Sequence, residues 1–287
     1  MKKCKDNGAR KMKFALKMAT VLCLLSLWVW GIVVEPYIML DYDNVEIAVP
    51  KWDKNLDGLK IAVLSDIHAG AGPAENWRLR RIVARTNAAK PDIILLLGDF
   101  VNGHPFYSEM PMSTYSKYLS GLKAPLGVYS VLGNHDSYYG REKIRKMLAD
   151  AGIPVIENSN LEIKTPKGNF HLAGIADAIT QNYFYRPTFA GIPKDAPVVF
   201  MSHTPDVFRE IPPAASFMLS GHTHGGQVRL PRGIRPAKNV KFERGAVEGL
   251  YRKDGKTSYT TRGLGTSRIP VRFMCTPAIT IATIRKA

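Results

Sequence analysis

The sequence predicts an α/β fold in which sheets are buried between helices, with a membrane-anchor helix at the N-terminus. Five apolar runs of strand length each end abruptly in polar residues and glycine, and segments of helical pattern lie between them. Runs of about four to eight apolar residues bounded by turn signals are typical of buried strands. Strands that alternate with helices are typical of sheets covered by helices. The anchor is predicted by an uncharged segment that follows a basic tail.

The N-terminal residues have the composition of a membrane anchor. Residues 1–17 carry seven Lys or Arg and the single acidic residue Asp6, and Met18 to Val34 carry no charge. A helix over the uncharged stretch reaches roughly 25 Å, the low end of what crosses a bilayer, and the apolar residues up to Leu40 extend it. No clear small-x-small cleavage site follows, which favours an uncleaved anchor over a signal peptide. We therefore expect a basic tail over 1–17, a transmembrane anchor over 18–40, a linker with the first strand over 41–57, and one domain over 58–287.

The charges that flank the anchor predict its orientation. Seven basic residues precede it, whereas the twenty residues after Val34 contain only Lys51 and Lys54. Because cytoplasmic flanks carry the excess of Lys and Arg, we expect a single pass through a bacterial inner membrane with the body outside the cytoplasm. A segment this short also permits an interfacial helix, which would leave the body on the cytoplasmic face.

Strands and helices alternate along the body in the order that a covered sheet requires. A helical pattern over 74–90 ends at Lys90-Pro91, and another over 141–152 ends at Gly152. In open α/β sheets, ligands bind beyond the carboxyl ends of the strands, so the residues that follow each apolar run form the candidate site. The runs and the polar residues after them span 59–68, 92–100, 127–136, 196–206 and 216–226.

Polar clusters follow all five runs and contain five of the seven histidines of the chain. Each residue alone has an ordinary explanation as a turn residue, a helix cap or a satisfied histidine. Their conjunction indicates a metal site, because neutral imidazole is the commonest protein metal ligand. His104 and His171 lie outside the pattern, and we expect a loop residue and a hairpin residue there. The clusters comprise Asp66, His68, Asp99, Asn134, His135, Asp136, His203, His222 and His224.

The candidate ligands offer nitrogen and oxygen atoms only, which suits divalent manganese, iron or zinc better than a calcium cage. Cys275 is the single cysteine of the body, which excludes a thiolate zinc cluster and an internal disulfide there. Asp99 has two oxygens with which to bridge two ions. Two metals about 3.5–4 Å apart clamp an in-line displacement at phosphorus and activate water near neutral pH. We therefore expect two divalent metal ions as cofactors.

The five motifs in this order resemble those of the calcineurin-like metallophosphoesterases, over about Ile61 to Gln227. They are D-x-H, G-D, G-N-H-D, a lone histidine and G-H-x-H. The resemblance implies a two-sheet αββα sandwich and a dinuclear metal centre. It also implies that His135 lies against the leaving oxygen or a phosphoryl oxygen and that Asp136 orients the His135 ring. One ion would be held by Asp66, His68, Asp99 and His224, and the other by Asp99, Asn134, His203 and His222.

The basic N-terminal anchor, "HTPD", "GHTHGGQ" and the ending "RGLGTSRIPVRFMCTPAIT" resemble the membrane-associated branch of that family. Some members cleave the pyrophosphate of UDP-2,3-diacylglucosamine in lipid A biosynthesis, and others are phosphodiesterases. The resemblance implies a hydrolase of phosphodiester or pyrophosphate bonds, with that nucleotide-lipid or another phospholipid as the leading substrate. Two alternatives stay open: an extracytoplasmic phosphodiesterase with another substrate, and a catalytically silent binding or scaffold protein. The silent alternative is disfavoured, because none of the seven expected ligands is missing.

A basic residue recurs at every third position after Gln227. Proline at two positions excludes a regular helix, whereas an extended chain with three residues per turn would align all six basic residues on one face. Ordinary surface charge is one interpretation, and a track for anionic lipid headgroups or a nucleotide diphosphate is the other. Nucleic acid is not expected as a partner, because stacking aromatic residues are not interleaved with the charges. The candidate anion-binding residues are Arg229, Arg232 and Arg235, and Lys238, Lys241 and Arg244 continue the series.

Overall fold

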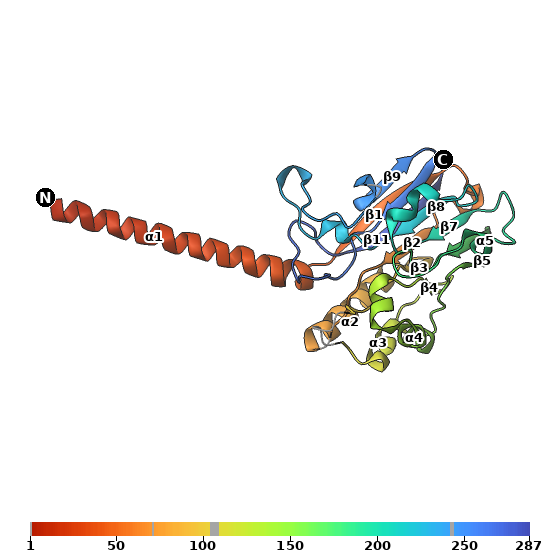
Figure 1. Ribbon diagram of the computed structural model, residues 1–287, viewed down its shortest axis with the longest axis horizontal. Helices are drawn as coiled ribbons and strands as arrows, with labels where there is room; N and C mark the ends of the chain where they lie inside the picture. The colour runs from red at the N-terminus through yellow and green to blue at the C-terminus, as the bar shows by residue number, and fades with distance from the viewer. Residues whose placement is uncertain (1, 71, 104–108, 242–243) are drawn as a thin grey trace.

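The computed structural model describes residues 2–70, 72–103, 109–241 and 244–287. The body of the protein is a sandwich of two mixed β-sheets, and a long N-terminal helix projects from one end of it (Figure 1). The predicted α/β sandwich is therefore confirmed. His104 lies outside the described residues.

The first sheet brings the two ends of the body together. Its strands are β1 (Asp41–Val49), β2 (Lys60–Leu64), β3 (Ile93–Leu96), β4 (Val128–Ser130) and β11 (Ala278–Lys286). Their order is β1-β11-β2-β3-β4. β11 is parallel to β1 and antiparallel to β2, and β2, β3 and β4 are parallel to one another. The last strand is therefore an interior strand of the sheet.

The second sheet consists of β5 (Ser159–Thr165), β6 (Gly168–Gly174), β7 (Val198–Met201), β8 (Phe217–Ser220), β9 (Gly249–Lys253) and β10 (Lys256–Thr260). Their order is β5-β6-β7-β8-β10-β9. β6, β7, β8 and β10 are parallel, and the outer strands β5 and β9 are antiparallel to their neighbours. His171 lies in β6, within the β5–β6 hairpin, so the prediction of a hairpin residue is confirmed.

Both faces of the central strands are buried, which explains why the strands are continuous apolar runs. In β2, Ile61 and Val63 face the core between the two sheets, whereas Ala62 and Leu64 pack beneath the helices. Each fully buried aliphatic side chain of this kind contributes about 1.5–3 kcal/mol. The helices over the first sheet are α2 (Pro73–Ala88), α3 (Met112–Leu119) and α4 (Asn134–Asp150), and α5 (Tyr185–Thr188) and the 3-10 helix η3 (Pro205–Glu210) cover the second.

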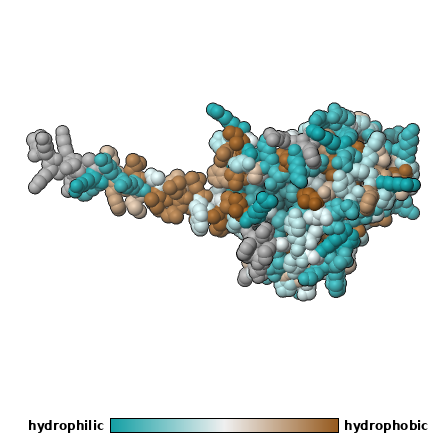
Figure 2. Space-filling model, in the orientation of Figure 1, coloured by the Kyte–Doolittle hydropathy of each residue, from teal (hydrophilic) through white to brown (hydrophobic). Residues whose placement is uncertain are grey.

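The N-terminal helix α1 (Lys2–Val29) continues as the π-helix η1 (Trp30–Ile38). The 29 residues from Arg10 to Ile38 are long and apolar enough to cross a membrane, by length and composition. The hydrophobic part of this helix extends away from the body (Figure 2).

Glu35 fixes the end of this helix to the body. Its side chain is buried and accepts hydrogen bonds from Trp30 Nε1 at 3.0 Å, from the amide of Met274 at 3.0 Å and from the amide of Cys275. Beside it, the amide of Arg272 donates to the carbonyl of Gly31 at 2.9 Å. A buried carboxylate without these donors would destabilise the folded protein. We therefore expect the end of the helix and the segment around residues 271–276 to stay packed together as one unit.

Candidate metal centre

The five polar clusters predicted from the sequence meet at one edge of the sandwich, beyond the carboxyl ends of β2, β3, β4, β7 and β8. Backbone hydrogen bonds join the loops: the Asp66 amide donates to Gly98 at 3.0 Å, and the Gly221 amide to His203 at 2.8 Å. Left-handed φ angles in non-glycine residues carry strain, which tends to occur at functional sites. Five residues of the clusters have such angles: Asp66 (54°), His68 (43°), Asp99 (56°), His222 (69°) and His224 (53°).

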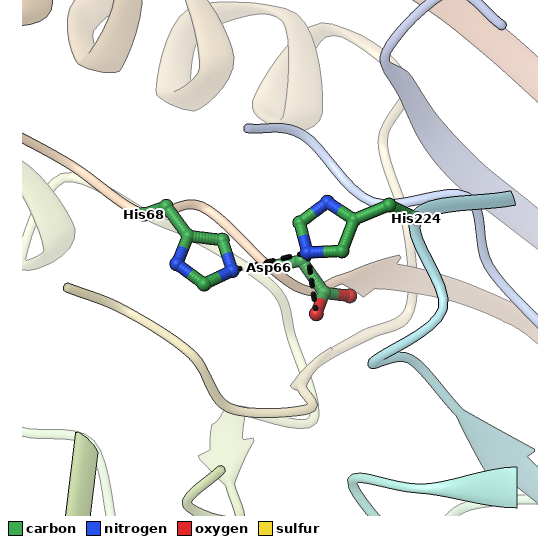
Figure 3. Close-up of side chains that lie close together, drawn as sticks. All are labelled: Asp66, His68 and His224. Carbon is green, nitrogen blue, oxygen red and sulfur yellow. Dashed lines mark hydrogen bonds and ion pairs between the residues drawn. The ribbon is translucent and has the colours of Figure 1, made fainter. Parts of the chain in front are cut away.

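One group of side chains comprises Asp66, His68 and His224, all buried (Figure 3). His68 Nε2 lies 3.1 Å from His224 Nε2, and the latter lies 3.6 Å from Asp66 Oδ1. Two β-strands from different sheets supply the group, since Asp66 and His68 follow β2 and His224 follows β8.

A second group surrounds His203. His203 Nε2 lies 3.2 Å from Asp99 Oδ2, from Asn134 Oδ1 and from His222 Nδ1. The same Asp99 oxygen lies 3.6 Å from His68 Nε2. Asp99 therefore lies between the two groups, in the position that an ion-bridging carboxylate would occupy.

The hydrogen bonds of the His203 and His224 rings indicate that metal ions fit between the ring nitrogens and the carboxylates. His203 Nδ1 lies 2.7 Å from the carbonyl oxygen of Leu97, which only accepts, so Nδ1 carries the ring proton. In the neutral ring, Nε2 is then a lone pair that faces the Asp99 carboxylate. His224 Nδ1 similarly lies 3.3 Å from the Gly265 carbonyl. Backbone carbonyls commonly orient metal-binding histidines in this way, so these residues fit a pair of metal ions.

The electrostatics of the groups agree with this fit. Burial lowers the pKa of His68 and of His222 to about 3, so both rings are neutral near pH 7, the form that binds metals. Burial raises the pKa of Asp66 to about 7. Burial also opposes a charge on His203, but the carboxylate of Asp99 outweighs it and raises the pKa of His203 well above its usual range. The excess of negative charge thus draws a proton to His203, and a divalent ion would take the place of that proton.

Glycine allows the loops to approach this closely. A Cβ atom at Gly133 would lie 2.2 Å from Asp99 Oδ1, and one at Gly221 would lie 1.9 Å from Ser65 Oγ. Neither position has room for a side chain, so glycine is required at both.

His135 lies beside the two groups and faces the cleft. Its ring packs edge-on against His68, with centroids 4.6 Å apart. Its Nδ1 contacts the carbonyl oxygen of Asn102, and its Nε2 lies 3.3 Å from Ser267 Oγ. Asn102 and Ser267 were missed by the sequence analysis. No local motif identifies them, because their contacts depend on loops distant in sequence.

The expectation that Asp136 orients the His135 ring is wrong. Asp136 Oδ2 accepts from the amides of Asp99 at 2.8 Å and Gly133 at 2.9 Å, and Oδ1 accepts from the amide of Phe100 at 2.8 Å. Burial raises the pKa of Asp136 to about 8, and the amide donors oppose this rise. The carboxyl group therefore holds the loop that carries Asp99, and the Asn102 carbonyl orients His135.

Members of both groups line a cleft of about 520 Å³, together with His135: they are Asp99, Asn134, His222 and His224. The residues of the basic segment that line it are Arg235, Lys238 and Lys241, and Ser267 and Arg268 form another part of the wall.

The basic residues from Arg229 to Lys241 do not lie along one regular extended chain, the arrangement that would have aligned them on one face. The 3-10 turn η5 (Pro231–Gly233) interrupts the segment, with Arg232 at a left-handed φ of 64°. Arg229 and Arg235 both pair with Glu248, Arg235 at 3.1 Å. Arg232 is exposed and is not one of the residues that line the cleft. Of the three candidate anion-binding residues, Arg235 alone is in the cleft wall.

Comparisons with known proteins identify relatives of the whole body. A family model described as calcineurin-like phosphoesterase matches residues 59–226. The phosphodiesterase YaeI of Escherichia coli is 36% identical over 233 residues, which cover 79% of this chain and 82% of that protein. The metallophosphoesterase YkuE of Bacillus subtilis is 29% identical over 233 residues, or 80% of each chain. A transmembrane protein with metallophosphoesterase domain from Danio rerio is 31% identical over 288 residues, which cover 93% of this chain and 63% of that protein.

Replacing Asp136 tests its structural role. Asp136→Ala leaves three buried amides without an acceptor, and each unsatisfied donor costs about 1–3 kcal/mol. We expect the free energy of unfolding of the metal-free protein to fall by about 3 kcal/mol or more, and Asp136→Asn, which keeps one oxygen acceptor, to lose less. Denaturant titration of chelated protein measures both. Ser137→Ala is the matched control, and an equal, small loss in Asp136→Ala and Ser137→Ala would contradict the assignment.

Proposed function

The chain belongs to the calcineurin-like phosphoesterase family, and we propose that its cleft hydrolyses a phosphodiester or pyrophosphate bond of a membrane-associated substrate. Members of this family are metal-dependent phosphoester hydrolases that use two divalent ions. One observation carries the proposal. Asp99 lies between two His/Asp groups at a single cleft, 3.6 Å from His68 of one group and 3.2 Å from His203 of the other, with His135 beside them.

We propose that the two groups each hold one ion of the manganese, iron or zinc kind. The first ion would be bound by Asp66, His68, Asp99 and His224, and the second by Asp99, Asn134, His203 and His222. When bound, such ions activate water and stabilise the charge that develops on the phosphoryl group.

The protein's own side chains supply the remaining steps. Because the Asn102 carbonyl contacts His135 Nδ1 and only accepts, Nδ1 carries one ring proton. A doubly protonated ring would give its second proton, on Nε2, to the leaving oxygen. Ser267 Oγ, 3.3 Å from that nitrogen, holds the ring toward the cleft. Arg235, Lys238 and Arg268 in the cleft wall offer positive charge to the anionic substrate.

A phosphorylated lipid or nucleotide-lipid is the substrate class that we favour. The support is the apolar N-terminal helix, the transmembrane relative and the basic wall of the cleft. UDP-2,3-diacylglucosamine is the leading single candidate within this class, and it requires the cleft to lie on the cytoplasmic face, opposite to the orientation that the flanking charges favour. The second candidate function is an extracytoplasmic phosphodiesterase with another substrate. The name of the Escherichia coli relative favours phosphodiester hydrolysis, and the flanking charges favour the extracytoplasmic location. Hydrolysis by the purified chain of a panel of nucleotide-lipids, phospholipids and simple phosphodiesters distinguishes them.

Asp99→Asn tests the shared carboxylate. The amide binds cations weakly and cannot bridge two ions as a carboxylate does, so we expect turnover to fall by more than the 10- to 100-fold typical of residues that only support a ligand, while the fold survives. Turnover is measured after chelation and restoration of metal. Asp92→Asn, at the opposite end of β3, is the matched control. Wild-type rates in Asp99→Asn would exclude the dinuclear mechanism.

His135→Ala separates catalysis from metal binding. We expect the variant to retain both metals and to lose turnover by about 10²- to 10⁴-fold, the usual contribution of a positioned acid. Metal content is measured by elemental analysis beside the kinetics. His171→Ala, the same substitution in the β5–β6 hairpin, should keep full turnover. Loss of metal in His135→Ala would instead make His135 a ligand.

The side of the membrane that carries the cleft follows from the flanking charges. The basic tail is expected to stay in the cytoplasm, so a C-terminal tag should be digested by protease added outside intact spheroplasts. Digestion would exclude a substrate confined to the cytoplasmic leaflet, such as a UDP-lipid at its site of synthesis. A protected tag would overturn the outward topology and support the UDP-lipid.

A further inference from the structure

Two segments join the cleft to the end of the N-terminal helix, and we call them the rim: residues 228–241 and residues 262–276. Ser267 of the rim contacts His135 at 3.3 Å, and the amide of Arg272 contacts the carbonyl of Gly31 at 2.9 Å. The amide of Arg229 donates to Phe273 at 2.8 Å, which ties the two segments together. Figure 1 shows both segments, in blue, at the end of the body from which α1 extends.

The contact with Gly31 sets the depth of the rim relative to a membrane. Gly31 lies within the uncharged stretch, three residues before its end at Val34. At about 1.5 Å per residue, that places the Arg272 backbone roughly 4 Å inside the apolar end of the helix. The span that is long and apolar enough to cross a membrane ends at Ile38, seven residues beyond Gly31. If the helix crosses the bilayer, the rim beside Gly31 is therefore drawn to the level of the lipid headgroups.

The rim exposes apolar side chains at this level. Ile269 is 58% exposed, Met274 57%, Ile234 56% and Leu230 41%. In Figure 2 the hydrophobic surface of the helix continues onto the adjoining end of the body. Arg232 and Arg268, both exposed, stand beside these apolar residues in the chain. Large apolar side chains next to arginine are typical of segments that bind at a membrane interface.

We propose that the rim is a membrane-docking surface. Its four apolar side chains enter the boundary between the headgroups and acyl chains of the bilayer that the helix crosses, and its arginines contact anionic headgroups. The cleft then opens at the headgroup layer, where a phosphate group reaches the metal centre while its lipid tail stays in the bilayer. The inference rests on the membrane crossing in the proposed function, and docking itself is independent of the substrate chosen there.

Depth-dependent fluorescence quenching tests the docking. The full-length chain, with Cys4 and Cys23 replaced by serine, carries a single introduced cysteine with an environment-sensitive label and is reconstituted in vesicles that contain phosphatidylglycerol. Doxyl groups near the lipid headgroups quench labels at the membrane surface, and doxyl groups deep in the acyl chains quench a label at the bilayer centre, such as the one at position 25. Label positions are Ile269→Cys and Met274→Cys in the rim, Leu25→Cys in the helix, and Leu161→Cys, 40% exposed on β5, as the control away from the rim.

We expect quenching at positions 269 and 274 at least twofold stronger than at 161. The docking surface is excluded if the rim labels are quenched no more than the label at 161. It is also excluded if a rim label is blue-shifted but not quenched by lipid, because a second copy of the chain would then cover the rim. Quenching at position 25 reports on the helix separately. If the label at 25 is not quenched, the membrane crossing fails and the docking proposal fails with it.

A kinetic comparison connects docking to turnover. The double variant Ile269→Glu/Met274→Glu places charges at the proposed interface and leaves the metal centre intact. We expect its turnover of the soluble diester bis(p-nitrophenyl) phosphate to stay within twofold of wild type, and its turnover of a phospholipid in vesicles to fall about tenfold. An equal effect on the two substrates would contradict a role of the rim in access to lipid. If wild-type protein cleaves only the soluble diester, the proposed lipid substrate is contradicted. Docking is then judged by the fluorescence quenching alone.

Discussion

Buried metal-binding atoms that face one another at close range constrain the whole edge of the sandwich. His203 Nε2 faces an oxygen of Asp99 at 3.2 Å, and His68 Nε2 faces His224 Nε2 at 3.1 Å. Each facing pair needs a proton or a metal ion between its two atoms, because two lone pairs cannot bond to one another. The surroundings keep the atoms there. Carbonyl oxygens contact the Nδ1 atoms of His203 and His224, and Asp136 accepts from three amides. Gly133 and Gly221 leave no side chain in the way. The buried sheets below supply the rigidity that such an arrangement needs.

The same edge is linked to the N-terminal helix by a short chain of contacts. Glu35 accepts from the amide of Cys275, and Cys275 Sγ donates to the carbonyl of His224 at 3.3 Å. Arg272, fully buried, donates to Gly265 and Cys275 and so fixes the intervening loop. A residue of the metal centre is thus two contacts away from the end of the helix. The position of the helix relative to the cleft is therefore set by the core of the protein and not by a flexible linker.

The sequence predicted the parts of the fold and the site that are encoded locally. Strand ends, helical patterns and the nine clustered residues could be identified because each is a short pattern, and strand polarity brings the clusters to one edge. The role of Asp136 could not be predicted from the sequence, because its carboxylate accepts hydrogen bonds from amides of another loop. The basic residues after Gln227 are not aligned on one face, because Arg232 has a left-handed backbone conformation and Glu248 forms ion pairs with both Arg229 and Arg235. Ser267 and Asn102 reach His135 only through tertiary contacts.

The place of β11 in the first sheet constrains when the domain folds. β11 lies between β1 and β2, although more than two hundred residues separate it from β2 in the chain. At synthesis rates of about 5–20 residues per second, β1 and β2 wait on the order of ten seconds or longer before the strand that joins them leaves the ribosome. During that interval each has an unpaired edge, which is prone to aggregation.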